Sequence, residues 1–357
     1  MRIAFLGDAS LTHVIRWVQF FKDEGHDVLL ITFEEPLEAP FKIERLKGLI
    51  PTKLGGYISR LATTKELIKK FDPDVVNSIY AAGYGPLGAL STDKPLVVTC
   101  LGSDILVDYP SSLIHRLQVP FALKKARLIT VDADLLTERI EQMGISRKKI
   151  IKTFFGIDDR LFHPLDDKEW PDRDPSPTII STRKLFSIYD LDMLIDAVPL
   201  ILSSKPNAKV VICGDGPERG RLENRAAAIG IEESIIFKGA LTPEEIAGEL
   251  QKADIYVSTS RSDSTSVSLL EAMACGIPPV VTDIEANREW IENGKNGILV
   301  PAGNAKELAM AIINLVNKKD LLDSMRRLNL SLVERKGLWQ ENMKLVEERI
   351  VSLAGQS

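Results

Sequence analysis

Two acidic residues flank a run of hydroxyl side chains in one short stretch of the sequence. Asp263 and Glu271 are separated by the seven residues Ser-Thr-Ser-Val-Ser-Leu-Leu. Residues 253–259 predict a strand before this loop, and Gly276 and Pro278 end the helix that would hold Glu271. A loop that enters a helix offers backbone N–H groups and the positive end of the helix dipole to an anion. Because carboxylates accept hydrogen bonds from hydroxyls, the stretch predicts phosphate recognition beside polyol recognition, as a nucleotide-sugar site requires.

The same stretch has simpler interpretations, which the sequence leaves open. Ser268 and Glu271 fit a capping box, in which Glu271 would bond back to the N–H of the cap. The hydroxyl residues around Asp263 could form only a turn. The context favours the anion site, because a strand precedes the loop and small residues follow in Ala272-Met-Ala-Cys-Gly.

Other candidate residues also follow predicted strands. Gly7 begins a turn whose amides could face a phosphate, whereas Gly214-Asp-Gly-Pro217 is more simply a tight turn. Asp104 could face a cleft or cap a helix. Arg183 and Lys184 lie just past a strand, where either cation could pair with a diphosphate.

Short apolar runs alternate with helical patterns along the chain. Helical patterns include 13–24, 63–71 and 133–143. This alternation predicts parallel, doubly wound sheets. The predicted strands are 2–6, 27–32, 75–78, 96–99, 128–131 and 149–153, followed by 178–181, 209–213, 234–237, 255–259, 279–282 and 297–300.

The alternation is interrupted by residues 162–177, which contain four prolines and many acids. We interpret this segment as an interdomain linker. The sequence therefore predicts an α/β protein with two Rossmann-like domains, 1–165 and 172–335, facing each other across a cleft. Ligands in such sheets bind at the C-terminal ends of the strands.

Composition excludes several function classes. The 357 residues are 45% apolar and 27% charged, with a net charge of −5, which argues against a general nucleic-acid role. Residues 1–165 carry 22 Lys and Arg against 20 Asp and Glu, whereas the remainder carries 23 against 30. The basic segments 42–70 and 147–152 could meet a membrane or an acidic acceptor, or be solvated helix faces.

Cysteine and histidine usage points away from disulfides and zinc. The three cysteines, Cys100, Cys213 and Cys275, lie far apart in apolar contexts, and we expect buried thiols in a reducing cytosol. The four histidines are scattered, and Asp132-Ala-Asp134 is a weak metal motif. Residues 1–7 predict a strand rather than a signal peptide, and no apolar run is long enough to span a membrane.

The chain resembles glycosyltransferase family 4, whose members have the GT-B fold. The most specific match is Asp263, seven residues, Glu271 and then Ala272-Met-Ala-Cys-Gly-Ile-Pro278. Supporting matches are Gly214-Asp-Gly-Pro217, Phe237-Lys-Gly239, Asn293-Gly-Lys-Asn-Gly297, Leu101-Gly-Ser-Asp104, and Phe155-Gly-Ile-Asp158 with Phe162. The resemblance covers nearly the whole chain and is strongest over 178–320. It also implies that the last helix, within 339–357, packs back on the first domain.

The resemblance assigns roles to individual residues. Glu271 would accept the ribose hydroxyls, and Asp263 would lie near the transferred sugar. Asp104 would line the acceptor side. Further donor contacts would come from the backbone of Phe237, Lys238 and Gly239 to the base, and from the amides of Thr265, Ser266, Val267 and Gly7 to the diphosphate.

The chain departs from the family pattern at several of these positions. The first acid is usually Glu, and Ser264-Thr-Ser266 replaces Gly-Phe-Gly. Tyr189 falls near a usual lysine, so one phosphate-binding cation is missing or comes from elsewhere. Leu101 stands where many relatives carry His.

The function implied is a retaining transfer of a sugar from a nucleoside diphosphate, such as UDP or GDP, to a hydroxyl acceptor without a metal or other cofactor. We expect a cytoplasmic enzyme of glycan, glycolipid or polysaccharide synthesis that acts on a sugar or lipid-linked acceptor. Peripheral membrane contact through 42–70 and 113–127 is left open, as is the oligomeric state.

Three alternatives are considered. The chain could be an inactive nucleotide-sugar-binding protein, which Asp263 and Tyr189 keep open. It could be a 2-epimerase on the same fold, although no suitable set of carboxylates and histidines is found. An NAD-dependent oxidoreductase is disfavoured, because a G-x-G-x-x-G motif with a downstream acid is missing.

Overall fold

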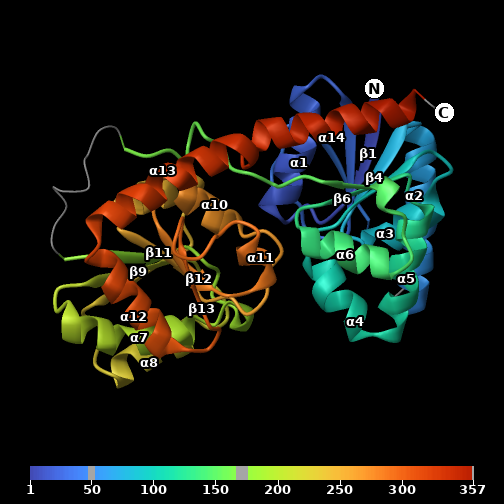
Figure 1. Cartoon of the computed structure of the whole chain (residues 1–357). Coiled ribbons are helices and arrows are strands. Elements are labelled where there is room, and N and C mark those ends of the chain that lie inside the picture. The colour runs from blue at the N-terminus through green and yellow to red at the C-terminus, as the bar shows by residue number, and fades with distance from the viewer. Residues whose placement is uncertain (47–52, 166–175, 356–357) are drawn as a thin grey trace. The chain divides into compact units, whose positions relative to one another are not determined.

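The computed structural model of the protein describes residues 1–46, 53–165 and 176–355. These residues form two compact units (Figure 1): Met1–Phe154 with Glu341–Ser357, and Phe155–Gln340. Residues 166–175 of the predicted linker lie outside the described residues, as do residues 47–52 of the basic segment.

The first unit is built on a seven-stranded parallel sheet. Its strands are β1 (Arg2–Leu6), β2 (Asp27–Thr32), β3 (Lys42–Arg45), β4 (Val75–Ile79), β5 (Leu96–Thr99), β6 (Leu128–Val131) and β7 (Ile150–Lys152). They are ordered β3-β2-β1-β4-β5-β6-β7, so the strand order reverses between β1 and β4. Parallel strands covered on both faces bury both sets of side chains, which explains why β5 and β6 are continuous buried segments.

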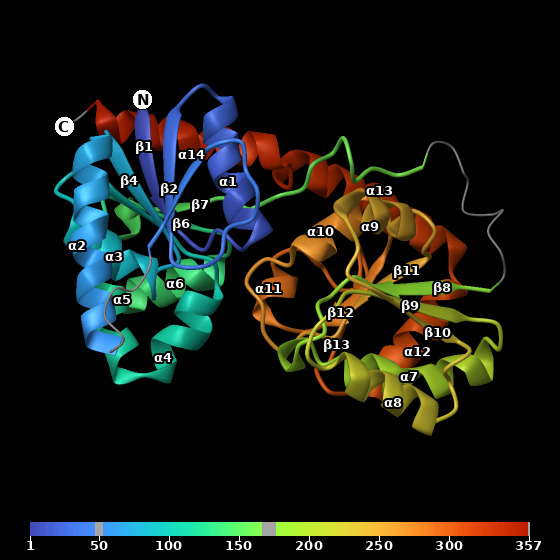
Figure 2. The same ribbon diagram turned by 180° about the vertical axis from the view of Figure 1, so that it is seen from behind.

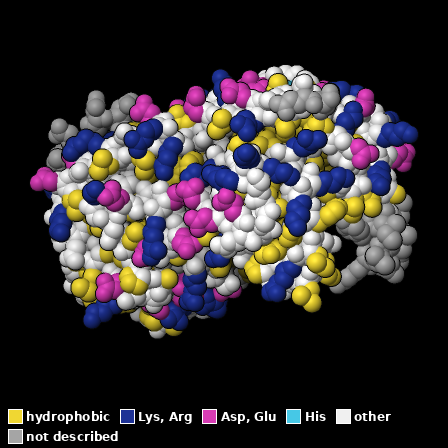
Figure 3. Space-filling view, turned by 45° about the vertical axis from the view of Figure 1, so that its right-hand side comes forward, with side chains coloured by type: hydrophobic (Ala, Val, Ile, Leu, Met, Phe, Trp, Pro, Cys, Tyr) yellow, Lys and Arg dark blue, Asp and Glu magenta, His cyan; other side chains and the backbone are white. Residues whose placement is uncertain are grey.

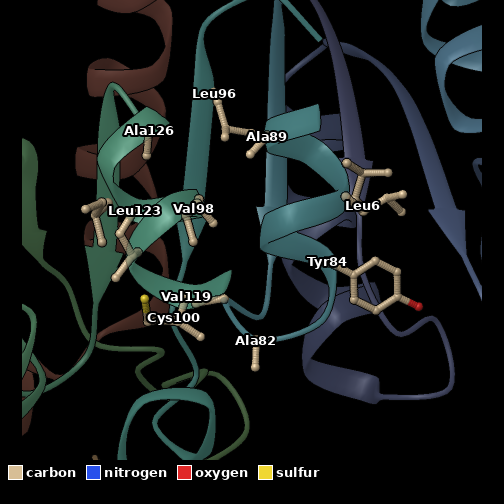
Figure 4. Packing of buried hydrophobic residues seen from close by; sticks show 14 of the residues in the cluster. Leu6, Ala82, Tyr84, Ala89, Leu96, Val98, Cys100, Val119, Leu123 and Ala126 are labelled. Carbon is tan, nitrogen blue, oxygen red and sulfur yellow. The ribbon is translucent and has the colours of Figure 1, made fainter. Parts of the chain in front are cut away.

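Helices cover this sheet. They are α1 (Thr12–Asp23), α2 (Lys53–Phe71), α3 (Tyr84–Ser91), α4 (Tyr109–Ser111), α5 (Leu113–Lys125), α6 (Asp134–Gln142) and α14 (Trp339–Ala354). Figure 4 shows Val119 and Leu123 of α5 directed toward Val98 of β5, within one hydrophobic core.

The C-terminal helix α14 belongs mostly to the first unit, where Figures 1 and 2 show it beside α1. Asn342 O accepts a hydrogen bond from Thr153 Oγ1 at 3.1 Å. Glu347 Oε1 lies 2.8 Å from His26 Nε2. The apolar side chain of Met343 is fully buried. The last helix therefore completes the first unit, although it is separated from it in sequence by the second.

The second unit repeats the design with six parallel strands. They are β8 (Thr178–Ser181), β9 (Lys209–Cys213), β10 (Ile235–Gly239), β11 (Ile255–Ser258), β12 (Pro279–Thr282) and β13 (Ile298–Val300). The order is β10-β9-β8-β11-β12-β13, with the reversal between β8 and β11. The helices are α7 (Leu191–Ser204), α8 (Arg219–Ala228), α9 (Pro243–Leu250), α10 (Val267–Ala274), α11 (Glu285–Arg288), α12 (Ala305–Val316) and α13 (Lys319–Lys336).

The predicted pair of doubly wound parallel sheets is confirmed. Strand β3 was not predicted, because its sequence Lys-Ile-Glu-Arg contains three charged residues. It lies at the sheet edge, where charged side chains discourage pairing with another chain. The three cysteines are buried and unpaired, as expected, and burial raises the pKa of Cys213 and Cys275 to about 12.

Candidate functional site

The candidate site lies where the strand order of the second unit reverses. In doubly wound sheets, ligands bind outside the carboxyl ends of the strands at this point. The loop after β8 carries Arg183, and the loop after β11 carries Asp263 and leads into α10. These two strands are neighbours in the sheet, so residues about eighty positions apart in sequence meet at one edge.

Arg183 is the centre of a hydrogen-bonded network at this edge. Its Nη1 donates to Ser266 Oγ at 2.6 Å and to Ser268 Oγ at 3.0 Å. Its Nη2 donates to Asp263 Oδ2 at 2.7 Å. Tyr256 extends the network through its hydroxyl, which lies 2.9 Å from Ser268 Oγ. The guanidinium thereby fixes the loop that enters α10.

The charge of Arg183 is maintained although only 7% of the residue is exposed. Burial alone lowers the pKa of an arginine, but the carboxylate of Asp263 raises that of Arg183 above its ordinary value. The guanidinium also lies 4.0 Å from the ring centroid of Tyr189, which adds a cation–π contact. Arg183 Nε is buried without a hydrogen-bond partner, and such an unpaired buried donor is costly.

The two predicted cations therefore differ in position. Lys184 is exposed, whereas Arg183 is buried in the network. Tyr189 occupies the face of the guanidinium. Arg261, in the loop after β11, is 62% exposed in its side chain and pairs with Asp190 Oδ2 at 2.9 Å. It is a further cation at this edge that the sequence did not single out.

The first turn of α10 excludes the predicted capping box and is compatible with the predicted anion site. Ser266 is the N-cap, and its Oγ accepts from the N–H of Leu269. The capping box of Ser268 with Glu271 is therefore wrong. Val267 is the first helical residue, and its N–H has no acceptor within the helix by position. Thr265 and Ser266 are buried beside it.

Glu271 lies in the second turn of α10 and is partly exposed. Its negative charge contributes to the raised pKa of two neighbours whose burial is the larger cause, Tyr256 and Cys275. Because Tyr256 belongs to the network of Arg183, the carboxylate of Glu271 lies near that network. Its predicted contact with a ribose stays a prediction.

The neighbouring strands complete the edge. The Cβ of any side chain at Gly214 would lie 2.3 Å from Arg183 O, so glycine allows the loop after β9 to pack against the main chain of Arg183. Lys238 Nζ pairs with Glu249 Oε2 at 2.9 Å. The base contact expected of the backbone at 237–239 stays a prediction. Phe237 packs partly against the core, and Gly239 has a φ of +75° that favours glycine.

In the first unit, the diphosphate contact predicted for the turn at Gly7 stays a prediction. The N–H of Gly7 itself donates to Ile31 O at 3.1 Å. Two later amides of the turn are also bonded, since Ala9 N donates to Thr32 Oγ1 and Ser10 N donates to Asp8 Oδ1. The glycine allows close packing, because a Cβ would lie 3.1 Å from Val14 Cγ1.

Asp104 is fully buried rather than open to an acceptor. Its Oδ2 accepts from the N–H of Ala81 at 2.7 Å, and its Oδ1 accepts from the N–H of Leu101 at 3.2 Å. The carboxylate thus ties the loop after β4 to the loop after β5. Burial raises the pKa of Asp104 to about 6, although these backbone N–H groups oppose the shift.

This raised pKa makes stability depend on pH. The folded-state pKa exceeds the ordinary value of 3.8, so the stabilisation is fully present below 3.8 and is lost as pH rises through about 6. The full stabilisation is about 3 kcal/mol, because a shift of one pKa unit corresponds to roughly 1.4 kcal/mol. We expect the wild type to gain stability on acidification relative to Asp104→Asn, as measured by urea denaturation. A constant difference between the two proteins across this range would contradict the assignment.

Tyr80 is a residue that the sequence did not single out. It follows β4 with a φ of +91°, a conformation that side-chain-bearing residues rarely adopt. Its hydroxyl donates to Asp108 Oδ2 and lies 3.2 Å from Ser103 Oγ. Ala81, the residue after Tyr80, donates its N–H to Asp104. The strained tyrosine and the buried acid therefore belong to the same hydrogen-bonded pair of loops. The feature of the sequence that could have indicated Tyr80 is a long polar side chain directly after a predicted strand.

The described part of the chain contains neither a group of residues suited to a metal ion nor a helix suited to membrane insertion. Among the described residues, no three His, Cys, Asp or Glu side chains are grouped so that they could hold a metal ion. Asp134, in the weak motif noted above, begins α6 and pairs with Lys152 Nζ at 2.7 Å. No described helix is long and apolar enough to cross a membrane.

Two sequence-family models match the chain. The glycosyl transferases group 1 model matches residues 163–329, and the glycosyl transferase 4-like model matches residues 2–133. The first match contains the entire edge from β8 to α10. The chain belongs to the GT4-type glycosyltransferases.

Curated relatives of this GT4-type chain align over part of their length. An alpha-D-kanosaminyltransferase from Streptomyces kanamyceticus is 24% identical over 69% of this chain and 67% of the relative. An N-acetyl-alpha-D-glucosaminyl L-malate synthase from Bacillus anthracis is 25% identical over 64% of this chain and 60% of the relative. The chain thus spans about two thirds or less of these proteins.

Solved structures establish the fold as GT-B. A sucrose-phosphate synthase from Thermosynechococcus elongatus superposes with a TM-score of 0.85 at 17% identity, covering 100% of both chains. HepE from Anabaena in complex with UDP-glucose superposes with a TM-score of 0.83 at 19% identity, covering 99% of this chain and 100% of that one. The predicted fold class is confirmed.

Proposed function

We propose that this protein transfers a sugar from a nucleoside-diphosphate sugar to a hydroxyl acceptor, with retention of the anomeric configuration. The observation that carries the proposal is the buried Arg183, held against the N-terminus of α10 by Ser266, Ser268 and Asp263. A cation and a helix N-terminus at the reversal point of a doubly wound sheet form a site suited to a diphosphate.

The chemistry requires stabilisation of the leaving group. As the bond from the anomeric carbon to the diphosphate breaks, negative charge grows on the diphosphate and the sugar becomes oxocarbenium-like. Arg183 and the amides at the start of α10, including that of Val267, would stabilise that charge without a metal. Exposed Lys184 and Arg261 would supplement it. Removing one such donor typically costs about 3 kcal/mol of barrier height.

Retention follows in this proposal from attack on the face that the diphosphate leaves. The acceptor oxygen forms a bond to the anomeric carbon, and its proton passes to the departing phosphate oxygen. No protein base is then needed. Glu271 would bind the ribose and Asp263 would lie near the sugar, while the backbone of 237–239 would hold the base.

Relatives support this choice of substrates. The neighbour HepE was solved with UDP-glucose, which favours UDP for this chain as well. A phosphatidyl-myo-inositol mannosyltransferase from Mycobacterium leprae is 33% identical over 37% of this chain, which is compatible with a lipid-linked acceptor. The buried, unpaired cysteines fit a protein that works in the reducing cytoplasm.

A thermal-shift screen with UDP, GDP, ADP and their sugars tests the donor site. A ligand that binds only the native state stabilises it by about 3 kcal/mol at roughly a hundred times its dissociation constant. We expect one diphosphate nucleotide to raise the melting temperature and the matching nucleoside to leave it unchanged. If none of the diphosphates shifts the transition, the proposed site is excluded.

A binding protein without transferase activity is the second candidate, because Asp263 is already paired with Arg183. Nucleotide-sugar binding without turnover against a panel of acceptors would favour it. A 2-epimerase is tested by product analysis in the absence of an acceptor, since only that enzyme converts the donor by itself.

A further inference from the structure

The inner face of helix α5 packs against the hydrophobic core of the first unit. Val119, Ala122 and Leu123 are completely buried, and Figure 4 shows labelled α5 side chains against β5. Ser112 caps the helix, since its Oγ accepts from the N–H of His115 at 3.2 Å. The helix therefore has a fixed orientation, and its opposite face is turned away from the core.

That opposite face is also apolar. At 100° per residue, positions 113, 114, 117 and 121 fall within an arc of about 100°. Leu113 is 77% exposed, Leu117 75% and Ile114 65%, and Phe121 is exposed as well. A helix with apolar residues on both faces is ordinarily buried on both, and a contiguous exposed patch marks an interaction site. Val107, just before α4, is also exposed.

Basic residues surround this apolar stripe. Lys124 and Lys125 continue it at the C-terminal end of α5, and Arg116 and Arg127 flank it. No acidic residue occurs from 109 to 131. In the lower right of Figure 3, where α4 and α5 lie, apolar and basic side chains are mixed with few acidic ones.

A cavity of about 410 Å³ lies just beyond the end of the helix. Three cations line it, namely Lys94, Lys125 and Arg127, against one acid, Asp93. The cavity adjoins the basic end of the stripe. Its size and charge suit the phosphate group of a lipid whose acyl chains lie against the apolar residues.

We propose that the outer face of α5 binds the surface of an anionic phospholipid bilayer. The apolar side chains of Leu113, Ile114, Leu117 and Phe121 enter the headgroup–acyl boundary. The cations Arg116, Lys124, Lys125 and Arg127 interact with the phosphates, and the cavity takes one headgroup. Amphipathic surfaces of this composition lie in the plane of the membrane interface and prefer anionic lipid.

A second copy of this chain fits the surface less well. Two such faces packed on each other would oppose four cations of one copy to four of the other, with no acid in the segment to separate them. Like charges in an interface raise the cost of association. An anionic bilayer has the complementary charge. The proposal is independent of the donor site, because all of these residues belong to the first unit.

Vesicle co-sedimentation tests the proposal with the full chain. We expect binding to vesicles of phosphatidylcholine mixed with phosphatidylglycerol, weakened by salt, and no binding to phosphatidylcholine alone. The double variant Leu113→Gln/Leu117→Gln should abolish binding, since glutamine keeps the helix but cannot enter the acyl region. Lys124→Gln/Lys125→Gln should weaken binding about thirtyfold, at roughly fivefold per basic residue.

A matched control is available on α14 of the same unit. Leu345 and Val351 are also exposed apolar residues on a helix, each at 44%. The variant Leu345→Gln/Val351→Gln should bind anionic vesicles as the wild type does, and melting curves should show that all variants fold. The proposal is overturned if the wild type ignores anionic vesicles or if the α14 variant loses as much binding as the α5 variant. It is equally overturned if the wild type is a dimer that Leu113→Gln/Leu117→Gln converts to a monomer.

Discussion

Glu271→Ala should abolish sugar transfer while leaving the protein folded. The carboxylate is expected to accept the ribose hydroxyls of the donor, and hydrogen bonds to a charged group contribute about 1.5–3 kcal/mol each. Loss of such contacts should lower kcat/KM by about a hundredfold or more. Glu271 is partly exposed in the second turn of α10, so alanine should cost little stability there. Transfer rates and thermal melting measure the two effects.

The matched control is Glu244→Ala, which removes an exposed glutamate from the first turn of α9 in the same unit. We expect this variant to retain full activity. A Glu271→Ala enzyme that transfers sugar at the wild-type rate would exclude the ribose-binding role. A variant that fails to fold would instead assign Glu271 a structural role, which the melting curve would reveal.

Arg183→Met should reduce both stability and donor binding. It removes the donor to Ser266, Ser268 and Asp263 at once. It also leaves the Asp263 carboxylate, which is 17% exposed, without its cation. Breaking a buried ion pair by deleting one partner costs about 3–5 kcal/mol. Urea denaturation should show this loss, and thermal shift should show that the diphosphate nucleotide no longer binds.

The double variant Arg183→Met/Asp263→Asn separates the two effects. Because the uncompensated charge is gone, it should recover part of the stability lost in the single variant but none of the nucleotide binding. The exposed pair of Arg288 and Asp283 serves as the control, since removal of Arg288 should cost less than about 1 kcal/mol. Equal destabilisation by Arg183→Met and Arg288→Met would show that Arg183 does not organise the loop.

Much of the fold could be predicted from local patterns. Strands such as Arg2–Leu6 and Leu128–Val131 are apolar runs bounded by turn residues, because a covered parallel strand must be apolar on both faces. The edge strand Lys42–Arg45 does not need apolar side chains on both faces, and its charged sequence therefore did not predict a strand. The assignment of α14 to the first unit came only from the family resemblance, since no local pattern indicates which distant surface a helix will cover.

The candidate site could be predicted less completely. The spacing of Asp263 and Glu271 indicated a loop entering a helix, and α10 begins there. The sequence could not choose between Arg183 and Lys184, because adjacent residues after a strand are equivalent until one side chain is buried. For Gly7 and Asp104, the sequence could not show that polar groups near the strand ends are bonded within the protein. The N–H of Gly7 donates to Ile31 O, and the carboxylate of Asp104 accepts from the backbone of Ala81 and Leu101.

The elements, their parallel arrangement and the segments that meet at the strand ends follow from the amino-acid sequence, because they depend on periodicity and turn residues close together in the chain. Which side chains are hydrogen-bonded within the protein and which face outward depends on tertiary packing. Arg183 is buried against Asp263, whereas Leu113 and Leu117 are exposed on α5. Hydrogen bonding and burial are set by neighbours that are distant in sequence, and a local pattern does not contain them.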